Sequence, residues 1–398
     1  MANLKKYIRK TVFYRPLAIL WCYLKNARLI LASFIFRFLK VQNNKIVFAS
    51  MVEKTFSLQP KMVYEELLNR IPDGLDVVWL LPDNVDCPDG VRKVRRKSIR
   101  SIYELSTAKV WVDNARKDFW IRKKKNQFYV QTWHGPVYIK GIENDCKKAL
   151  SPNYIAGAKQ DSKNADYIVS ETEWSTGRLP STFWYDGAII EGEFKRPAYF
   201  NSEESCRKVR SFYNIKDGEE IVLYVPTFRR DGNTDCYSLQ FESVLKELKA
   251  KYGKDYKFIV RLHPNIAEKQ DFLEYSERVL NGSVYPSVDE LTIASDIIIS
   301  DYSSCIFEGF RTQKKVFLFA TDIEEYANDD RGLNFDLFNL PAPMAQNNDE
   351  MINNIINFDA QTYKKKSDEF TKRLGYYEAD AAAIVVDHIQ NYLLSQKK

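Results

Sequence analysis

The chain has 398 residues, a formal net charge of +6, 45% hydrophobic residues and 28% charged residues. This length is too great for one ordinary hydrophobic core and predicts two domains. The composition is that of a folded globular protein and excludes wholesale disorder. The six cysteines form no C-x-x-C pair, so neither a zinc ribbon nor a disulfide framework is predicted, and a reducing cytoplasm is the simple expectation.

Residues 1–42 are predicted to form a basic N-terminal element. Residues 1–52 hold ten of the 59 Lys and Arg residues and none of the 53 acidic ones. Two apolar runs, LAILWCYL and LILASFIF, are separated by polar residues, and neither reaches the roughly 18 residues that span a bilayer. Basic and aromatic residues at near-helical spacing predict amphipathic helices that lie in an anionic membrane surface. A helical cap packed on the main body is the alternative. Nucleic acid is not a predicted partner, because no basic stripe follows.

From Asn44 onward, short apolar runs alternate with amphipathic stretches. The predicted strands are KIVFAS, DVVWLL, KVWVD, QFYVQT and DYIVS, then EIVLYVP, KFIVRLH, DIIIS and VFLFA. Helices are predicted at PKMVYEELLNR, SLQFESVLKELKAKYG, EKQDFLEYSERVL and DEMINNIINF. Such alternation predicts parallel sheets covered on both faces. We therefore expect an α/β protein with two Rossmann-like domains facing a cleft: residues 43–212, and residues 213–398 including the C-terminal helix.

Ligands of such sheets bind beyond the carboxyl ends of the strands, and polar residues gather at four of these ends. Two of the chain's three histidines are among them, whereas His388 lies in the predicted C-terminal helix and is expected to be structural. Arg261 and His263 are two residues apart, so their side chains are expected to point the same way. The candidates are His134 after QFYVQT, Thr227 and Arg229 after EIVLYV, Arg261 and His263 after KFIV, and Asp301, Ser303 and Ser304 after DIII.

The stretch SDYSSCIFEGF predicts an anion site. Ser300 or Asp301 is expected to cap a helix and to leave the hydroxyls of Ser303 and Ser304 beside free backbone N–H groups. A plain helix cap is the alternative. Basic residues at the neighbouring strand ends favour phosphate, which needs several converging donors.

Other cofactor classes lack their motifs. The chain has no G-x-x-x-x-G-K-[ST] loop and no G-x-G-x-x-G, which speaks against an ATPase or a dehydrogenase. No His/Cys cluster with ligand spacing demands a metal, and Asp329 and Asp330 could bind one or cap a loop. A metal-free, cofactor-free transferase acting on a nucleotide diphosphate fits these residues.

Five motifs carry a family resemblance. WHG, PTFR, RLHP, SDYSS and Y-x-x-D-D-R-G-L-x-F-D-L occur in this order within Lys45 to Leu393. They resemble the CDP-glycerol glycerophosphotransferase family of teichoic-acid and capsule synthesis. The resemblance implies a glycosyltransferase-B architecture, peripheral association with the cytoplasmic face of the membrane, and transfer of a polyol phosphate from a CDP-polyol with release of CMP.

The resemblance also implies a role for each candidate residue. His134 would be the base that deprotonates the acceptor hydroxyl, and His263, with Arg261 beside it, would contact the donor diphosphate and stabilise the departing CMP. The other implied donor-binding residues are Ser303 and Ser304 at phosphate, Asp301 at the polyol or its own turn, and Thr227, Arg229 and Arg331 in the donor pocket. The loop after WHG departs from the family pattern, because Lys140 is its first basic residue.

The predicted reaction moves glycerol phosphate from CDP-glycerol to a hydroxyl of a lipid-linked glycan or teichoic-acid polymer. CDP-ribitol as donor is one alternative, and a nucleotide-sugar glycosyltransferase of the same fold is another. A non-catalytic membrane scaffold that binds glycan is the alternative from a different class. The sequence predicts no oligomeric state.

Overall fold

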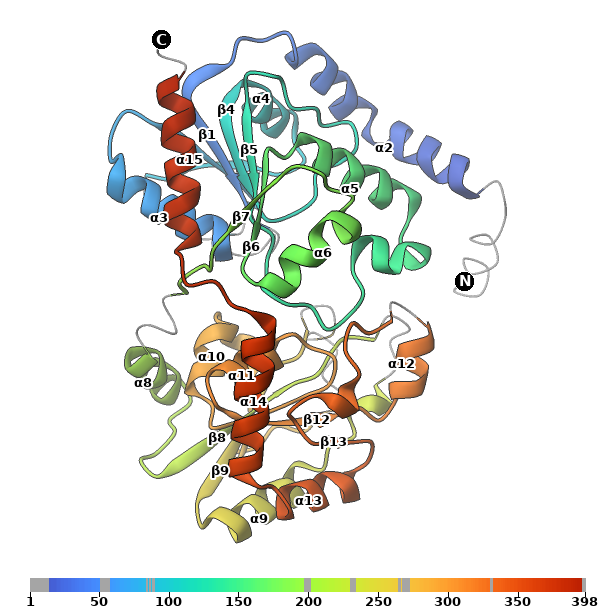
Figure 1. Ribbon diagram of the computed structural model, residues 1–398, viewed down its shortest axis with the longest axis vertical. Helices are drawn as coiled ribbons and strands as arrows, with labels where there is room; N and C mark the ends of the chain where they lie inside the picture. The colour runs from blue at the N-terminus through green and yellow to red at the C-terminus, as the bar shows by residue number, and fades with distance from the viewer. Residues whose placement is uncertain are drawn as a thin grey trace. The chain divides into compact units, whose positions relative to one another are not determined.

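The computed structural model describes residues 14–50, 58–83, 85, 87, 90–196, 202–229, 234–263, 266, 273–329 and 332–395. The chain forms two compact α/β units (Figure 1). The first unit consists of Met1–Pro136, Ile142–Lys195 and Tyr376–Lys398, and the second of Val137–Gly141 and Arg196–Gly375. Each unit contains one parallel sheet, which confirms the predicted fold class.

The sheet of the first unit has seven strands in the order β3-β2-β1-β4-β5-β6-β7, all parallel. Its strands are β1 (Gln42–Ala49), β2 (Asp76–Leu81), β3 (Arg92–Arg95), β4 (Ala108–Asp113), β5 (Phe128–Gln131), β6 (Tyr167–Ser170) and β7 (Ala188–Glu191). Successive side chains of β1 enter different cores: Ile46 and Phe48 one, and Val47 and Ala49 the other. Both faces of the sheet are therefore covered, as the continuous apolar strands predict.

Helices form both covers of this sheet. The helices are α2 (Tyr14–Phe36), α3 (Leu58–Arg70), α4 (Ile99–Thr107), α5 (Pro152–Asn164), α6 (Glu173–Phe183) and α15 (Ala381–Ser395), with a 3-10 helix η1 (Glu143–Ala149). Residues of α3 and α15 pack on the face of Ile46, and residues of α2 and α4 on the face of Val47. Ser98 and Ser101 form a capping box that fixes the start of α4.

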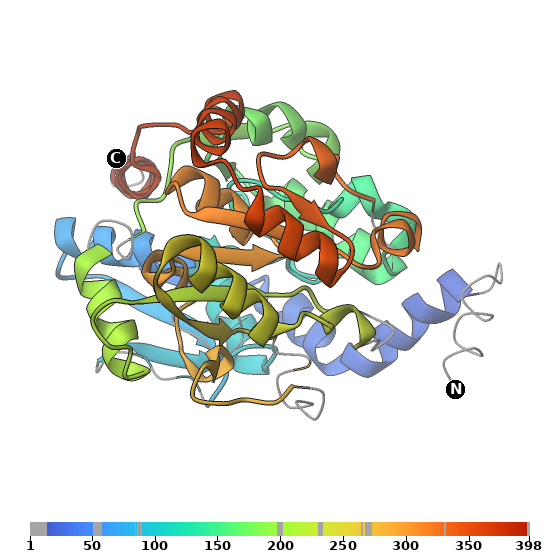
Figure 2. The ribbon, with the colours of Figure 1, turned by 90° about the horizontal axis from the view of Figure 1, so that it is seen from below.

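The second unit has a six-stranded parallel sheet in the order β10-β9-β8-β11-β12-β13. Its strands are β8 (Glu219–Val225), β9 (Asp255–Val260), β10 (Val279–Asn281), β11 (Ile297–Ser300), β12 (Lys315–Phe319) and β13 (Met344–Ala345). Its helices are α8 (Ser202–Phe212), α9 (Phe241–Tyr252), α10 (Val288–Ala294), α11 (Cys305–Arg311), α12 (Ile323–Asp329), α13 (Asn348–Ile356) and α14 (Ala360–Leu374), with 3-10 helices η2 (Asp235–Tyr237), η3 (Gly282–Val284) and η4 (Leu337–Asn339). Figure 2 shows α9 and α13 side by side, and both contribute to the core on one face of the sheet, while α8 and α10 pack on the other.

The structure differs from the sequence predictions in the domain boundaries and in one helix. Residues 196–212, which include α8, belong to the second unit rather than the first. The C-terminal helix α15 belongs to the first unit rather than the second, because Ala381, Val385 and Ile389 complete the core against α3 and the sheet. The predicted helix EKQDFLEYSERVL is wrong in its described part. Residues 273–278 form no regular element, and Val279–Asn281 is the strand β10, which pairs with β9.

The N-terminal element is one continuous helix, α2, in its described part, and residues 1–13 lie outside it. Leu29 and Ala32 pack in the core, while Trp21, Leu24 and Phe34 are 69%, 63% and 58% exposed. In Figures 1 and 2 the N-terminal end of α2 projects past the rest of the first unit. Within the described residues, no helix combines the length and the apolar character needed to cross a bilayer.

Candidate active site

His134 lies in a tight loop after β5, and hydrogen bonds hold this loop from both sides. Trp133 has a left-handed backbone, with φ 55°, and its N–H donates to Oε1 of Gln131 at 3.0 Å. The carbonyl of Pro136 accepts hydrogen bonds from the hydroxyls of Thr172, at 3.1 Å, and of Ser175. The loop is therefore fixed to the strand before it and to the start of α6, which defines the position of the half-buried imidazole.

The hydrogen bond of His134 assigns its tautomer. Nδ1 lies 3.2 Å from the backbone carbonyl of Asn114, which can only accept a hydrogen bond, so Nδ1 carries a proton. The pKa of His134 is lowered from 6.5 to about 4: burial is the main cause, the hydrogen bond to Asn114 opposes it, and the positive charge of Arg116 adds to the lowering. The ring is therefore neutral at pH 7, with its lone pair on Nε2. A neutral imidazole with a free Nε2 can accept a proton.

The charges around His134 are paired with one another. The guanidinium of Arg116 lies 3.2 Å from a carboxylate oxygen of Glu143 and 3.3 Å from one of Asp161, and its side chain is 5% exposed. It also lies over the ring of Trp133, 5.6 Å from the centroid. Glu143 and Asp161 therefore hold Arg116 in place beside the loop. The positive charge of Arg116 makes a smaller contribution than burial to the lowered pKa of His134.

Asp301, which follows β11, organises the end of the neighbouring strand β8. Its carboxylate accepts hydrogen bonds from the N–H of Thr227, at 2.9 and 3.0 Å, and from the N–H of Tyr302 at 2.6 Å. It also accepts a bond from the guanidinium of Arg229 at 2.9 Å. Asp301 is 2% exposed, so all these bonds lie inside the protein. The structure places Asp301 where it holds the PTFR loop.

Arg229 is bound by a second carboxylate. Its guanidinium donates to both oxygens of Asp322, at 2.6 and 3.0 Å, and lies 4.9 Å from the ring centroid of Tyr302. Burial alone would lower the pKa of Arg229, but its bond to Asp322 and the charge of Asp301 raise it well above its usual value. The side chain is 6% exposed. Its charge is thus balanced by two carboxylates.

Arg261 and His263 point to different surroundings, contrary to the expectation from their spacing. Arg261 donates to the backbone carbonyls of Gly282 and Tyr285, at 3.1 and 2.6 Å. His263 is exposed and stacks on Phe228, with ring centroids 5.6 Å apart. The strand β9 ends at Val260, so strand alternation does not extend to either residue. Although part of the side chain is exposed, partial loss of solvent around the ring and the nearby charge of Lys140 lower the pKa of His263.

Ser303 and Ser304 stand at the start of α11, but the predicted capping by Ser300 or Asp301 is wrong. The N-cap residue is Ser304 itself, and its side chain makes no capping bond. The hydroxyl of Ser300 instead donates to the carbonyl of Val225 at 2.6 Å. Ser304 is exposed, and its oxygen accepts a long hydrogen bond of 3.4 Å from the N–H of Ile139. Both hydroxyls of the predicted anion site therefore lie at the end of β11, as expected.

Sequence comparison places the chain in a family. A model described as CDP-Glycerol:Poly(glycerophosphate) glycerophosphotransferase matches residues 31–391. The chain belongs to this family. The teichoic acid poly(glycerol phosphate) polymerase of Staphylococcus epidermidis is 31% identical over 350 residues, which are 84% of this chain and 48% of that protein. The protein of the same name from Bacillus spizizenii is 30% identical over 380 residues, 90% of this chain and 95% of that one.

The fold is also that of a solved polymerase. A structure of the wall teichoic acid polymerase TagF, a histidine variant soaked with CDPG, has a TM-score of 0.78 and 26% identity. The match covers 97% of this chain and 98% of that one. This chain spans about half the length of the S. epidermidis relative. This chain and the solved TagF chain therefore share this fold over the matched region.

The structure adds two residues to the candidate site of this glycerophosphotransferase family member. Lys140 carries the charge that acts on His263, and its ammonium lies 5.6 Å from the ring centroid of Tyr326. Asp322 binds Arg229 from the end of β12, a strand end where the sequence motifs gave no signal. Lys140 could have been identified from the sequence, because it is the first basic residue after WHG. Arg331 lies outside the described residues, and those residues contain no cluster of His, Cys, Asp and Glu that could hold a metal ion.

Proposed function

We propose that this protein transfers glycerol phosphate from CDP-glycerol to a hydroxyl of a lipid-linked glycan or teichoic-acid polymer, with release of CMP. The observation that carries the proposal is His134, a half-buried neutral imidazole whose Nδ1 is bonded to a carbonyl and whose Nε2 has no hydrogen bond within the described residues. Membership of the family and the names of its relatives support the same reaction.

In the proposed reaction the first unit supplies the base. Nε2 of His134 takes the proton of the acceptor hydroxyl while the oxygen attacks the β-phosphorus of CDP-glycerol. A new phosphorus–oxygen bond forms, the bond from the β-phosphorus to the bridging oxygen breaks, and CMP leaves with the bonding electron pair. Such a transfer depends mainly on positioning and on stabilising the developing charge.

The second unit binds the donor in this proposal. His263 is exposed and its ring can donate a hydrogen bond to the diphosphate, with the charge of Lys140 close by. The hydroxyls of Ser303 and Ser304 bind phosphate, and Arg331 contributes a further charge. Asp301, Arg229 and Thr227 shape the pocket through their mutual hydrogen bonds, and Arg261 supports the chain beside His263. We propose that these groups suffice without a metal ion or cofactor.

We further propose that the protein binds peripherally to the cytoplasmic face of the membrane through α2. The exposed face of this helix carries large apolar side chains, and its surroundings carry Lys25, Arg28, Arg37 and Lys40 without an acidic residue. An apolar face flanked by basic residues binds anionic membranes. Replacing Trp21, Leu24 and Phe34 by Gln should move the protein from the vesicle pellet to the supernatant. The control variant Ile356→Gln/Leu394→Gln changes two exposed apolar residues outside α2 and should stay in the vesicle pellet. An equal loss of vesicle binding in the α2 variant and the control would reject this role of α2.

Release of CMP tests the reaction. The protein is incubated with CDP-glycerol or CDP-ribitol, with membrane extract as acceptor, in the presence and absence of a chelator. We expect acceptor-dependent CMP release from CDP-glycerol that the chelator does not reduce. CMP from CDP-ribitol alone would change the donor, and release of another nucleotide from a nucleotide sugar would overturn the proposed reaction.

A further inference from the structure

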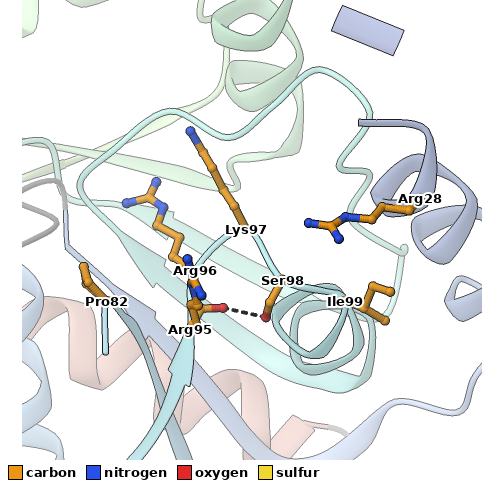
Figure 3. A pocket seen from close by; sticks show the side chains of 7 residues that line it. All are labelled: Arg28, Pro82, Arg95, Arg96, Lys97, Ser98 and Ile99. Atoms are coloured by element: carbon orange, nitrogen blue, oxygen red, sulfur yellow. Dashed lines mark hydrogen bonds between the residues drawn. The ribbon is translucent and has the colours of Figure 1, made fainter. Parts of the chain in front are cut away.

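A pocket of about 500 Å³ in the first unit is lined by four cationic side chains. These residues, here called the basic pocket, are Arg28, Arg95, Arg96 and Lys97. Arg28 comes from α2, and the other three lie where β3 leads into α4 (Figure 3). In Figure 3 the guanidinium of Arg28 points from α2 toward the turn that carries Lys97. No acidic residue lines the pocket, so four positive charges share one hollow.

The charges of the basic pocket are largely unneutralised. In the part of the chain that the structure describes, Arg28 and Lys97 make neither a hydrogen bond nor an ion pair. Arg96 donates one bond, to the carbonyl of Ser50 at 3.0 Å. Arg95 has only Asp83, at 3.6 Å, and both side chains are 72% exposed, so that pair contributes little.

Nearby basic residues behave differently, which makes the basic pocket distinct. The ammonium of Lys117 lies 2.9 Å from a carboxylate oxygen of Asp113, and both side chains are at most 5% exposed. Arg116 is paired with two buried carboxylates, as described above. Among the described residues, the cations beneath this surface are thus in direct contact with carboxylates, whereas Arg96 and Lys97 have only the charge of Asp118 nearby, without an ion pair. The cations of the basic pocket can therefore bind an external anion.

The basic pocket continues toward His134. Arg96 and Lys97 also line a neighbouring cavity of about 320 Å³, whose wall includes Trp133 and His134. On its other side the basic pocket is bounded by Arg28 of α2, the helix with the exposed apolar face. A single extended molecule could therefore place a lipid at α2, a phosphate in the basic pocket and a hydroxyl at His134.

We propose that the basic pocket binds phosphate groups of the lipid-linked acceptor and so guides its terminal hydroxyl to His134. This inference rests on the proposed function. The acceptor group that binds in the basic pocket is a phosphodiester or a diphosphate. Guanidinium and ammonium groups bind such oxygens with charge-assisted hydrogen bonds.

A soluble, lipid-free oligomer of glycerol phosphate is the probe for this site. Its affinity for the full chain is measured by calorimetric titration, with the pocket variant Arg28→Gln/Lys97→Gln. The matched control, Lys25→Gln/Arg37→Gln, removes the same charge from exposed positions that do not line the pocket. We expect the pocket variant to lose about tenfold or more in affinity and the control less than about twofold. Equal affinities of the two variants would overturn the proposal.

Vesicles of phosphatidylglycerol and phosphatidylcholine test the other source of phosphate, a lipid headgroup. An acceptor site predicts that the pocket variant and the control lose similar vesicle binding, because each removes two charges near the membrane. Selective loss of vesicle binding by the pocket variant, with its oligomer affinity intact, would identify a headgroup site instead and overturn the proposal.

A substitution at Asp118 should raise the affinity for the oligomer instead of lowering it. Asp118 lines the cavity between Lys97 and His134, and its charge acts on both Arg96 and Lys97. Asp118→Asn removes a carboxylate that repels an entering phosphate, so the affinity for the oligomer should rise about threefold. An unchanged or lower affinity would contradict a phosphate path along this cavity.

Kinetics separate this inference from the proposed function. With wild-type CMP release established, the pocket variant should raise the KM for the acceptor about tenfold or more. An unchanged KM would reject the basic pocket while the proposed function stands. Absence of CMP release from any CDP-polyol, with oligomer binding still dependent on the basic pocket, would reject the proposed function and leave the phosphate site standing.

Discussion

The two units hold their motif residues in different ways. In the first unit, burial keeps one histidine, His134, neutral, and the nearby cation, Arg116, is itself paired with two buried carboxylates. In the second unit, the charged motif residues Asp301 and Arg229 bind each other, whereas His263 and Ser304 are exposed. The strand-end motifs therefore contain two kinds of residue: buried ones that fix a loop, and exposed ones that we propose bind the ligand.

The largest expected effect is on the base. His134→Ala should reduce CMP release at least about a hundredfold, because a positioned base contributes about 10²- to 10⁴-fold. The control is His388→Ala. His388 lies in α15, and its ring centroid is 4.4 Å from that of Tyr167. This variant should retain activity within about twofold. A loss under tenfold in His134→Ala would show that another group takes the proton.

A loop-holding residue should act on stability. Arg229→Met leaves the carboxylates of Asp301 and Asp322 without their partner, and breaking a buried pair costs about 3–5 kcal/mol. Scanning calorimetry, which can resolve the transitions of the two units, measures this loss. Arg278→Met removes an exposed pair with Glu242 in the same unit and should cost under about 1 kcal/mol. Equal losses in both variants would contradict the loop-holding role.

A ligand-facing residue should act on donor binding. His263→Ala should weaken the binding of CDP-glycerol about tenfold, because a hydrogen bond to a charged group contributes about 1.5–3 kcal/mol. The melting temperature should change little, because the ring is exposed. Isothermal titration measures the affinity. A large loss of stability with unchanged affinity would place His263 among the loop-holding residues.

The smallest expected effect is at α11. Ser304→Ala removes an exposed hydroxyl whose side chain, among the described residues, accepts only the 3.4 Å hydrogen bond from the N–H of Ile139. Donor affinity should fall about two- to tenfold, less than for a lone bond to a charged group, because the hydroxyl of Ser303 remains to bind the phosphate. Ser238→Ala, an exposed serine of the same unit, is the control and should leave the affinity unchanged. Equal affinities of both variants would remove Ser304 from the donor site.

The sequence predicted the central strands and missed the edges. All nine predicted strands are present, and the four others, β3, β7, β10 and β13, are the edge strands of the two sheets. A central parallel strand is buried on both faces and reads as a continuous apolar run. An edge strand such as RKVR in β3 is short and polar, a usual property of exposed edges, and carries no such signal.

The candidate site was predictable in position but not in detail. Motif spacing located His134, Asp301 and Ser304 at strand ends, where the structure has them. It did not reveal that Asp322, distant in sequence, neutralises Arg229, because that pairing depends on tertiary packing. The direction of Arg261 was also missed, since β9 ends one residue earlier.

The most direct measurement is an NMR titration of His134, which is practical because the chain has only three histidines. The His134→Gln spectrum assigns its signals. A buried neutral base predicts a pKa near 4 and the Nδ1–H tautomer at pH 7, since pH 7 is well above that pKa. A pKa at or above 6.5, or a proton on Nε2 in the neutral ring, would contradict the role of His134 as the base that accepts the hydroxyl proton.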